Sequence, residues 1–132
     1  MPGETVLLVD PDADVQATIG RLLVHHGYRV VGVRDAAAAL EAAQGEAPDV
    51  VIVDPSPGRN LVAGHAVLRE LGGLRGIPVI AVTADVVRLP VASLLAEGYA
   101  AAAAKPCSLA VVVRAVRRVL DARPAPPPAP LT

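Results

Sequence analysis

The feature that most constrains this 132-residue chain is an alternation, repeated five times, between short apolar runs and longer stretches rich in Ala and Leu. The short runs lie at residues 5–9, 29–33, 49–53, 77–82 and 99–104. Apolar runs without polar alternation are typical of strands that are covered on both faces. The last run is the weakest, because consecutive alanines have low β-propensity, and its place in the alternation decides its assignment as a strand.

The longer stretches have recognisable helix ends. They predict helices through about residue 25 and at residues 36–44, 65–71, 91–97 and 109–122. The expected N-terminal caps are Asp12 or Asp14, Asp35 and Ser108, and Pro90 precedes the fourth helix. The expected stops are Gly27, Gly45, Gly72 with Gly73, and Gly98.

Five strand–helix units in strict alternation predict one α/β domain with a doubly wound, five-stranded parallel sheet and helices on both faces. In such sheets ligands bind outside the carboxyl ends of the strands, where the strand order reverses. We expect the domain to cover residues 1–122. Residues 123–132 are rich in proline and predict an extended tail or the start of a linker.

Composition excludes several classes of function. Twelve basic residues against thirteen acidic ones leave a formal charge of −1, which gives no basic footprint for nucleic acid. A single cysteine excludes an internal disulfide and a multi-cysteine zinc site. The chain has no signal-peptide pattern and no apolar stretch of roughly 18 residues. We therefore expect a cytoplasmic protein that binds neither nucleic acid nor a membrane.

Polar side chains follow four of the predicted strands. Asp10 and Asp12 follow the first, Asp54 the third, Thr83 the fourth and Lys105 the fifth. The fold would bring these groups into one crevice, where a hard cation such as Mg²⁺ would relieve the repulsion between carboxylates. A cation, a hydroxyl and an ammonium together would neutralise the oxygens of a phosphoryl group. The pattern favours phosphoryl transfer to a carboxylate.

Four segments stand in a fixed order at these strand ends. They are V-L-L-V-D-P-D-A-D-V at residues 6–15, D-V-V-I-V-D at 49–54 with Pro57-Gly58 after it, P-V-I-A-V-T-A at 78–84, and Lys105-Pro106. In order and spacing they resemble the CheY-like receiver domains of bacterial two-component response regulators. The resemblance spans residues 6–120 and implies the strand order 2-1-3-4-5.

The resemblance implies a role for each residue. Asp54 would accept the phosphoryl group, and Asp10 would belong to the acidic pair that holds Mg²⁺, together with the backbone carbonyl of Ser56. Thr83 would bond the phosphoryl group and Lys105 would pair with it. The donor would be a histidine kinase or a phosphotransfer protein. The domain would be a signalling switch, at most catalysing its own phosphorylation and dephosphorylation.

The chain departs from the family pattern at three places, which are the loop after Asp54 and two single residues that keep a second hypothesis open. Pro11 stands where the second acid of the pair is usual, so Asp12 is the candidate substitute as a metal ligand. Ala102 stands where the family has its switch aromatic. These residues favour a degenerate receiver that acts as an interaction module independent of phosphorylation. The intact Asp54, Thr83 and Lys105 favour a working switch.

The last predicted helix is the expected place for contacts with partners. Its arginines are either a solvated face or a docking surface, and a homodimer through this helix is an open option. They are Arg114, Arg117, Arg118 and, just beyond the helix, Arg123. A flavin or nucleotide site is disfavoured, because neither a G-x-G-x-x-G nor a Walker loop follows the first strand.

Overall fold

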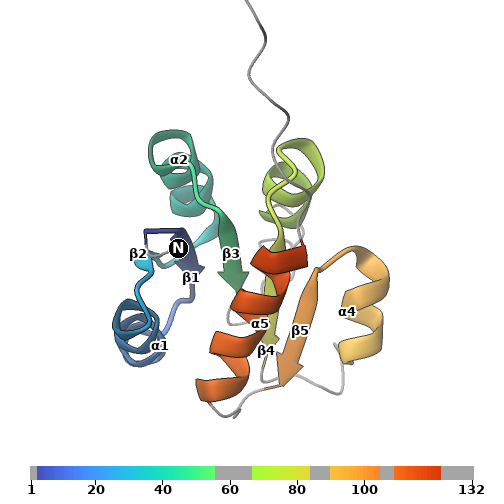
Figure 1. Ribbon diagram of the computed structural model, residues 1–132. Helices are drawn as coiled ribbons and strands as arrows, with labels where there is room; N and C mark the ends of the chain where they lie inside the picture. The colour runs from blue at the N-terminus through green and yellow to red at the C-terminus, as the bar shows by residue number, and fades with distance from the viewer. Residues whose placement is uncertain (1–2, 56–66, 84–89, 105–108, 123–132) are drawn as a thin grey trace, which may run out of the picture.

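The structure is a computed structural model, and it describes residues 3–55, 67–83, 90–104 and 109–122. Within these residues the chain forms a five-stranded sheet in the order β2-β1-β3-β4-β5, with every neighbouring pair parallel (Figure 1). The strands are β1 Thr5–Val9, β2 Arg29–Val33, β3 Val50–Val53, β4 Val79–Thr83 and β5 Ala101–Ala104. The predicted fold class and strand order are confirmed.

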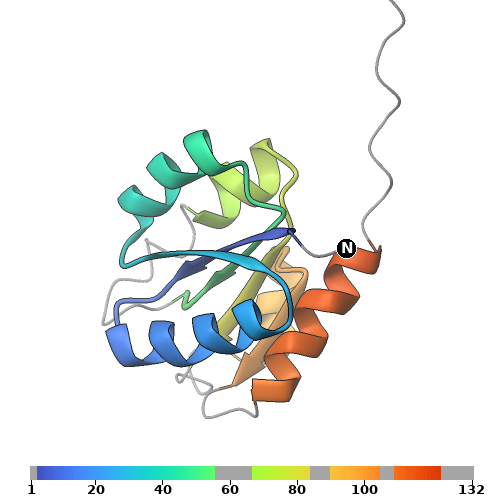
Figure 2. The same ribbon diagram turned by 60° about the vertical axis from the view of Figure 1, so that its left-hand side comes forward.

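Helices cover both faces of this sheet. They are α1 Ala13–His25, α2 Ala36–Glu46, the π-helix η1 Leu68–Leu74, α4 Val91–Glu97 and α5 Leu109–Ala122. Figure 2 shows the sheet between α2 with η1 on one side and α1 with α5 on the other. None of the helices in the described part of the chain has the length and apolar character needed to cross a bilayer.

Each sheet face has its own hydrophobic core. The first core packs α1 and α5 on the sheet, with Leu23 and Val116 completely buried. The second packs α2, η1 and α4 on the opposite face, with Leu71 and Leu94 buried. Alternate residues of the central strands contribute their side chains to one core or the other, since successive side chains of a strand point to opposite faces. β1 and β3 are buried throughout for this reason.

The ends of two helices differ from the prediction. Gly45 lies inside α2, which ends at Ala47 in the left-handed region with φ of 47°. Arg75 Nη1 donates to the carbonyl of Ala43 at 3.1 Å and so caps this end. Gly72 and Gly73 do not stop the third helix either, because they lie within η1. His65, where that helix was predicted to begin, and the predicted cap Ser108 lie outside the described residues.

Three strands begin one or two residues later than predicted. Asp49 N–H donates to the carbonyl of Thr5 and so continues the β1–β3 ladder, although β3 itself begins at Val50. Ile77 N–H donates to the carbonyl of Leu71 in η1, and Tyr99 N–H donates to the carbonyl of Leu94 in α4. These bonds join the residues just before β4 and β5 to the preceding helices. The strand interiors agree with the prediction.

Candidate functional site

Asp10 and Asp54 lie side by side at the carboxyl ends of the two central strands. Val9 and Val53 are partners across the β1–β3 ladder, and Asp54 N–H donates to the carbonyl of Val9 at 3.2 Å. Asp10 N–H donates to the carbonyl of Val33 at 3.1 Å, which continues the ladder to β2. The strand that follows β1 in the chain, β2, lies on one side of it, and the next strand, β3, lies on its other side. Such a switch point is the usual ligand site of the fold.

Asp10 is held firmly in the turn that leads into α1. The residue is only 3% exposed, and its Oδ1 accepts a hydrogen bond from Asp12 N–H at 2.9 Å. Its backbone carbonyl accepts one from the Gln16 side chain at 2.7 Å. A buried carboxylate fixed in this way at a strand end is preorganised to bind a cation or a charged group.

Asp12 has a different environment. Its exposed side chain is the N-cap of α1, and its Oδ1 accepts from Asp14 N–H at 2.9 Å and from Val15 N–H at 3.3 Å. The cap therefore uses Asp12 and not Asp14, and the carboxylate is engaged with the helix. Pro11, between the two acids, is exposed, and its carbonyl accepts from Arg34 Nη2 at 3.4 Å.

Gln16 is a supporting residue that the sequence reasoning missed. Its side-chain amide donates to the carbonyl of Asp10 and also to that of Val33, so it ties the ends of β1 and β2 together. A Cβ at Gly32 would lie 2.6 Å from Gln16 Oε1, so glycine makes room for this contact. The available signal was a long amide side chain one turn beyond the cap Asp12, combined with a glycine inside a strand.

Thr83 completes the described part of the site. It is fully buried as the last residue of β4 and pairs with Ala104, the last residue of β5. β4 lies next to β3, so the Thr83 end of β4 faces the Asp54 end of β3. Lys105 directly follows Ala104 in the sequence, and it lies outside the described residues, as does Ser56.

Tyr99 is a second residue whose importance the sequence did not indicate. It lies just before β5, is 4% exposed and packs in the same core as Val53, the neighbour of Asp54. Burial raises the pKa of Tyr99 to about 12, with further contributions from the negative charges of Glu97 and Asp54. The sequence offered one signal, which is that this is one of only two aromatic residues.

The chemistry of these side chains fits a magnesium ion. Mg²⁺ in proteins commonly binds one or two carboxylates and keeps several waters, and Asp10 with Asp54 supplies such a pair. Within the described ranges no group of three His, Cys, Asp or Glu side chains is gathered for a metal. Asp12 as a metal ligand stays a prediction, and its present partners are the amides of α1.

Comparisons with known proteins agree with this geometry. Residues 6–117 match the family model of the response regulator receiver domain. The probable transcriptional regulator ycf27 of Guillardia theta is 34% identical over 118 residues, which are 87% of this chain and 46% of the relative. The regulatory protein VirG of Agrobacterium tumefaciens (strain 15955) is 30% identical over 124 residues, which are 93% of this chain and 46% of the relative. The chain thus spans about half the length of these relatives.

Solved structures show the same fold. The chemotaxis response regulator CheY4 of Vibrio cholerae matches with a TM-score of 0.73 at 24% identity, covering 88% of this chain and 98% of its own. NtrX from Brucella abortus matches with a TM-score of 0.81 at 23% identity, covering 92% of this chain and 27% of its own.

A doubly wound sheet with paired carboxylates at its switch point is the architecture of phosphoryl-accepting receiver domains. This chain belongs to the response regulator receiver domain family of two-component systems. The general function of the family is to accept a phosphoryl group on an aspartate, and its members generally bind Mg²⁺ at the acidic site. They interact with histidine kinases or phosphotransfer proteins.

Proposed function

We propose that Asp54 is the phosphoacceptor of this receiver domain and that the phosphoryl group acts as the signal. The observation that carries the proposal is the meeting of Asp10, Asp54 and Thr83 at the carboxyl ends of three neighbouring strands. Asp54 is half-buried, so a donor can reach it while the sheet still holds it in place. Asp10 and Thr83 are buried beside it.

In the transfer, a carboxylate oxygen of Asp54 forms a bond to phosphorus while the P–N bond of a phosphohistidine breaks. The electron pair of that bond stays on the imidazole, which takes up a proton from solvent, and Asp54 becomes an acylphosphate. Asp10, Asp54 and the backbone carbonyl of Ser56 would hold Mg²⁺, which supplies neutralisation of the phosphoryl oxygens. The hydroxyl of Thr83 donates a hydrogen bond to one phosphoryl oxygen, and the ammonium of Lys105 forms an ion pair with another.

The proposal extends to the setting of the domain. Residues 1–122 form the receiver and residues 123–132 an extended tail or linker. The phosphoryl donor is a histidine kinase or phosphotransfer protein of the cytoplasm, and this chain binds neither nucleic acid nor membrane. The domain catalyses only its own phosphorylation and dephosphorylation. A homodimer through α5 is supported by Val111, an exposed apolar side chain on that helix.

The test is incubation with acetyl phosphate and Mg²⁺, followed by intact-mass spectrometry. We expect a gain of one phosphoryl group that disappears in Asp54→Asn and in the presence of EDTA. Asp49→Asn is the matched control, because this carboxylate also adjoins β3 but accepts from Thr5 N–H at the opposite end of the strand. Labelling that persists in Asp54→Asn would refute the assignment.

The two remaining acids can be separated by titration with Mg²⁺. Asp10→Asn is expected to weaken Mg²⁺ binding at least tenfold, because a buried ligand charge is lost. Asp12→Asn retains an N-capping side chain, so it isolates the metal contribution of Asp12 from the stability of α1. Unchanged affinity in Asp12→Asn assigns Asp12 to the cap alone, and weakened affinity makes it a metal ligand.

A second candidate is an interaction module that works without phosphorylation. The observation in its favour is the engagement of Asp12 with α1, next to Pro11, which leaves Asp10 and Asp54 as the acids of the described site. Ala102, half-buried in β5, offers no aromatic ring to respond to Thr83. Absence of both phosphorylation and Mg²⁺ binding would select this candidate.

A further inference from the structure

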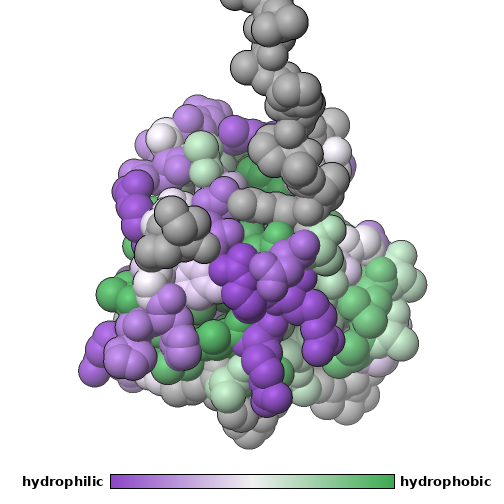
Figure 3. Space-filling view, in the orientation of Figure 1, coloured by the Kyte–Doolittle hydropathy of each residue, from purple (hydrophilic) through white to green (hydrophobic). Residues whose placement is uncertain are grey.

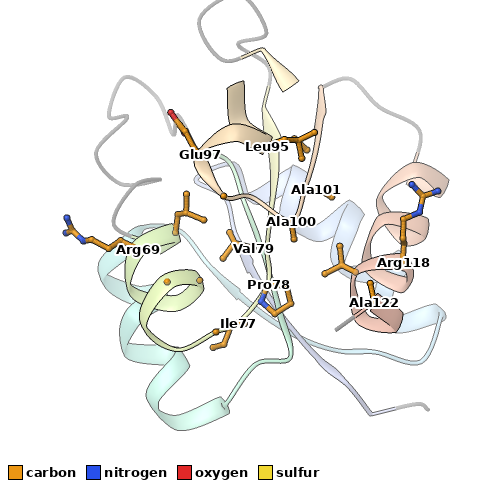
Figure 4. Close-up of a pocket in the computed structure, with 17 residues that line it drawn as sticks. Arg69, Ile77, Pro78, Val79, Leu95, Glu97, Ala100, Ala101, Arg118 and Ala122 are labelled. Carbon is orange, nitrogen blue, oxygen red and sulfur yellow. The ribbon is translucent and has the colours of Figure 1, made fainter. Parts of the chain in front are cut away.

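A groove crosses the N-terminal ends of β4 and β5, at the end of the sheet opposite to the acidic site. Its volume is about 1200 Å³, and its walls come from η1, the end of α4 and the last turns of α5. Figure 4 shows Pro78, Val79 and Ala100 along its floor, with Arg69 and Arg118 at opposite sides.

The groove is hollow because nearly half of its lining residues are glycine or alanine. Four glycines and four alanines are among the lining residues, and they are Gly72, Gly73, Gly76, Gly98, Ala100, Ala101, Ala102 and Ala122. The larger members are mostly apolar, such as Leu68 and Ile77, and the charged ones are Arg69, Glu97 and Arg118. The groove therefore suits a slender, apolar and uncharged occupant.

The sequence that follows α5 has this character. Residues 124–131 read P-A-P-P-P-A-P-L and contain no charged or polar side chain. They begin two positions after Ala122, which is the last described residue of α5 and itself lines the groove. A tethered segment of this kind has a high effective concentration at a site next to its anchor.

Length and conformation also fit. Eight residues in polyproline II conformation span roughly 25 Å at 3.1 Å per residue. The path from α5 across β5 and β4 to η1 is roughly 20 Å, which is two strand spacings plus one layer spacing. A proline-rich segment loses little conformational entropy when it docks, because it is already extended.

The edge of the sheet gives a further reason for a cover. β5 is the outermost described strand on its side, and its four residues are all alanines that are only half-buried. An edge strand presents backbone N–H groups along its outer side, and prolines offer carbonyl acceptors without donors of their own. An occupant rich in proline that crosses the N-terminal end of β5 can accept from backbone N–H groups there without extending the sheet.

We propose that the proline-rich segment 124–131 of this chain docks intramolecularly in the groove lined by η1, the N-terminal end of β5 and the C-terminal end of α5. The docked segment covers the apolar lining and shields the N-terminal end of β5. It also joins the end of α5 to η1 across the sheet, so that whatever follows the receiver in the chain is held against it. The proposal does not depend on phosphorylation at Asp54.

The test measures backbone order parameters of Ala125 and Ala129 by ¹⁵N relaxation in the full chain. Docking predicts values near those of rigid backbone, about 0.85, and a free tail predicts values below about 0.6. Gly73→Leu places a side chain in the groove, where a Cβ meets nothing within 4 Å, and should release the segment. Gly45→Leu is the matched control, since it adds the same side chain in equally open space on α2 and should leave the segment docked.

A second variant keeps the proposal testable if Gly73→Leu fails to fold. Replacing the five prolines of the segment by serine preserves its length, and the amides of Gly98 and Ala101 should then exchange at least tenfold faster. Low order parameters in the wild-type chain overturn the proposal, as does an ordered segment that Gly73→Leu leaves unaffected. Order that appears only at high protein concentration would place the segment in a second copy and overturn intramolecular docking.

Discussion

At the scale of single residues, the acidic site depends on neighbours that do not themselves carry the chemistry. Gln16 fixes the backbone of Asp10, and Gly32 makes room for Gln16. The negative charge of Asp54 contributes to the raised pKa of Tyr99, which is buried in the second core. These three residues connect the site to α1, β2 and β5, and each connection can be measured separately.

The titration of Tyr99 reports the charge at Asp54. In a Tyr28→Phe background, Tyr99 is the only tyrosine, and its pKa should be about 12 by absorbance titration. Asp54→Asn removes one of the negative charges that raise this pKa, so the midpoint should fall. Asp35→Asn keeps the cap of α2 and alters a charge that is not among the causes of the shift, so the midpoint should stay.

The same shift determines how stability depends on pH. The pKa of Tyr99 in the folded protein lies above its unfolded value of 10.0, so folding favours the neutral phenol. This contribution is complete below pH 10 and is lost as the pH rises from about 10 to about 12. Tyr99→Phe should flatten the stability profile in that window. An identical profile in wild type and Tyr99→Phe would contradict the burial of the phenol.

Gly32 and Gln16 should be coupled. Gly32→Ala should destabilise the fold by about 1–3 kcal/mol, because its Cβ displaces an amide that donates to two carbonyls. In a Gln16→Ala background the clash is gone, and Gly32→Ala should be neutral or stabilising by up to about 1 kcal/mol. Gly20→Ala, whose Cβ makes an ordinary 3.7 Å contact, is the control. If the losses in free energy of unfolding from Gly32→Ala and Gln16→Ala are additive in denaturant titrations, the contact between the two residues is absent.

At the scale of secondary-structure elements, helix ends follow tertiary contacts as much as local signals. Asp12 and Asp35 cap α1 and α2 as expected, because an acid at that position can reach the first free amides wherever it occurs. The stop of α2 was predicted two residues too early. Arg75, from the loop after η1, binds the carbonyl of Ala43 and supports the extra half-turn.

The glycine near the end of α2 is therefore misplaced for stability. Gly45→Ala should stabilise the protein by about 0.5–1 kcal/mol, because glycine costs entropy inside a helix and the new Cβ meets nothing within 4 Å. Ala47→Gly should add about 1 kcal/mol, since φ of 47° suits glycine. Thermal unfolding of both variants and of the pair measures this. A loss of stability in Ala47→Gly would show that Ala47 does not adopt the left-handed conformation.

At the scale of the whole molecule, one sheet joins two cores into a single cooperative unit. Figure 3 shows the polar surface over α5 and the more apolar surface over α4, so the helices differ in what they present to solvent. Their buried sides are alike in kind, with Leu23 in one core and Leu94 in the other completely buried.

Cavities in either core should lower the stability of the entire domain. Leu23→Ala and Leu94→Ala should each cost about 2–5 kcal/mol, and unfolding should stay a single transition monitored by any probe. Val24→Ala and Leu95→Ala, which are neighbours with 58% and 46% exposed side chains, should cost about 0.5 kcal/mol or less. Two separate transitions in Leu94→Ala would show that the cores unfold independently.

The sequence by itself determined the strand–helix alternation, the strand order through its resemblance to a family, and the strand ends at which Asp10, Asp54 and Thr83 stand. The alternation and the strand ends follow from local apolar runs and from the geometry shared by all parallel sheets, so they need no knowledge of packing. Lys105 and Ser56 remain predictions at the same ends.

Only the tertiary structure decided what surrounds those residues. Four features join segments that are distant in the chain or depend on a side-chain rotamer. They are the hydrogen bonds from the Gln16 side chain, the engagement of Asp12 with α1, the coupling of Tyr99 to Asp54 and the groove at the N-terminal end of β5. Periodicity and caps report on neighbours within one or two turns, whereas these contacts arise when separate elements pack together. A sequence pattern therefore predicted the position of the candidate site, and packing determined the environment of its described residues.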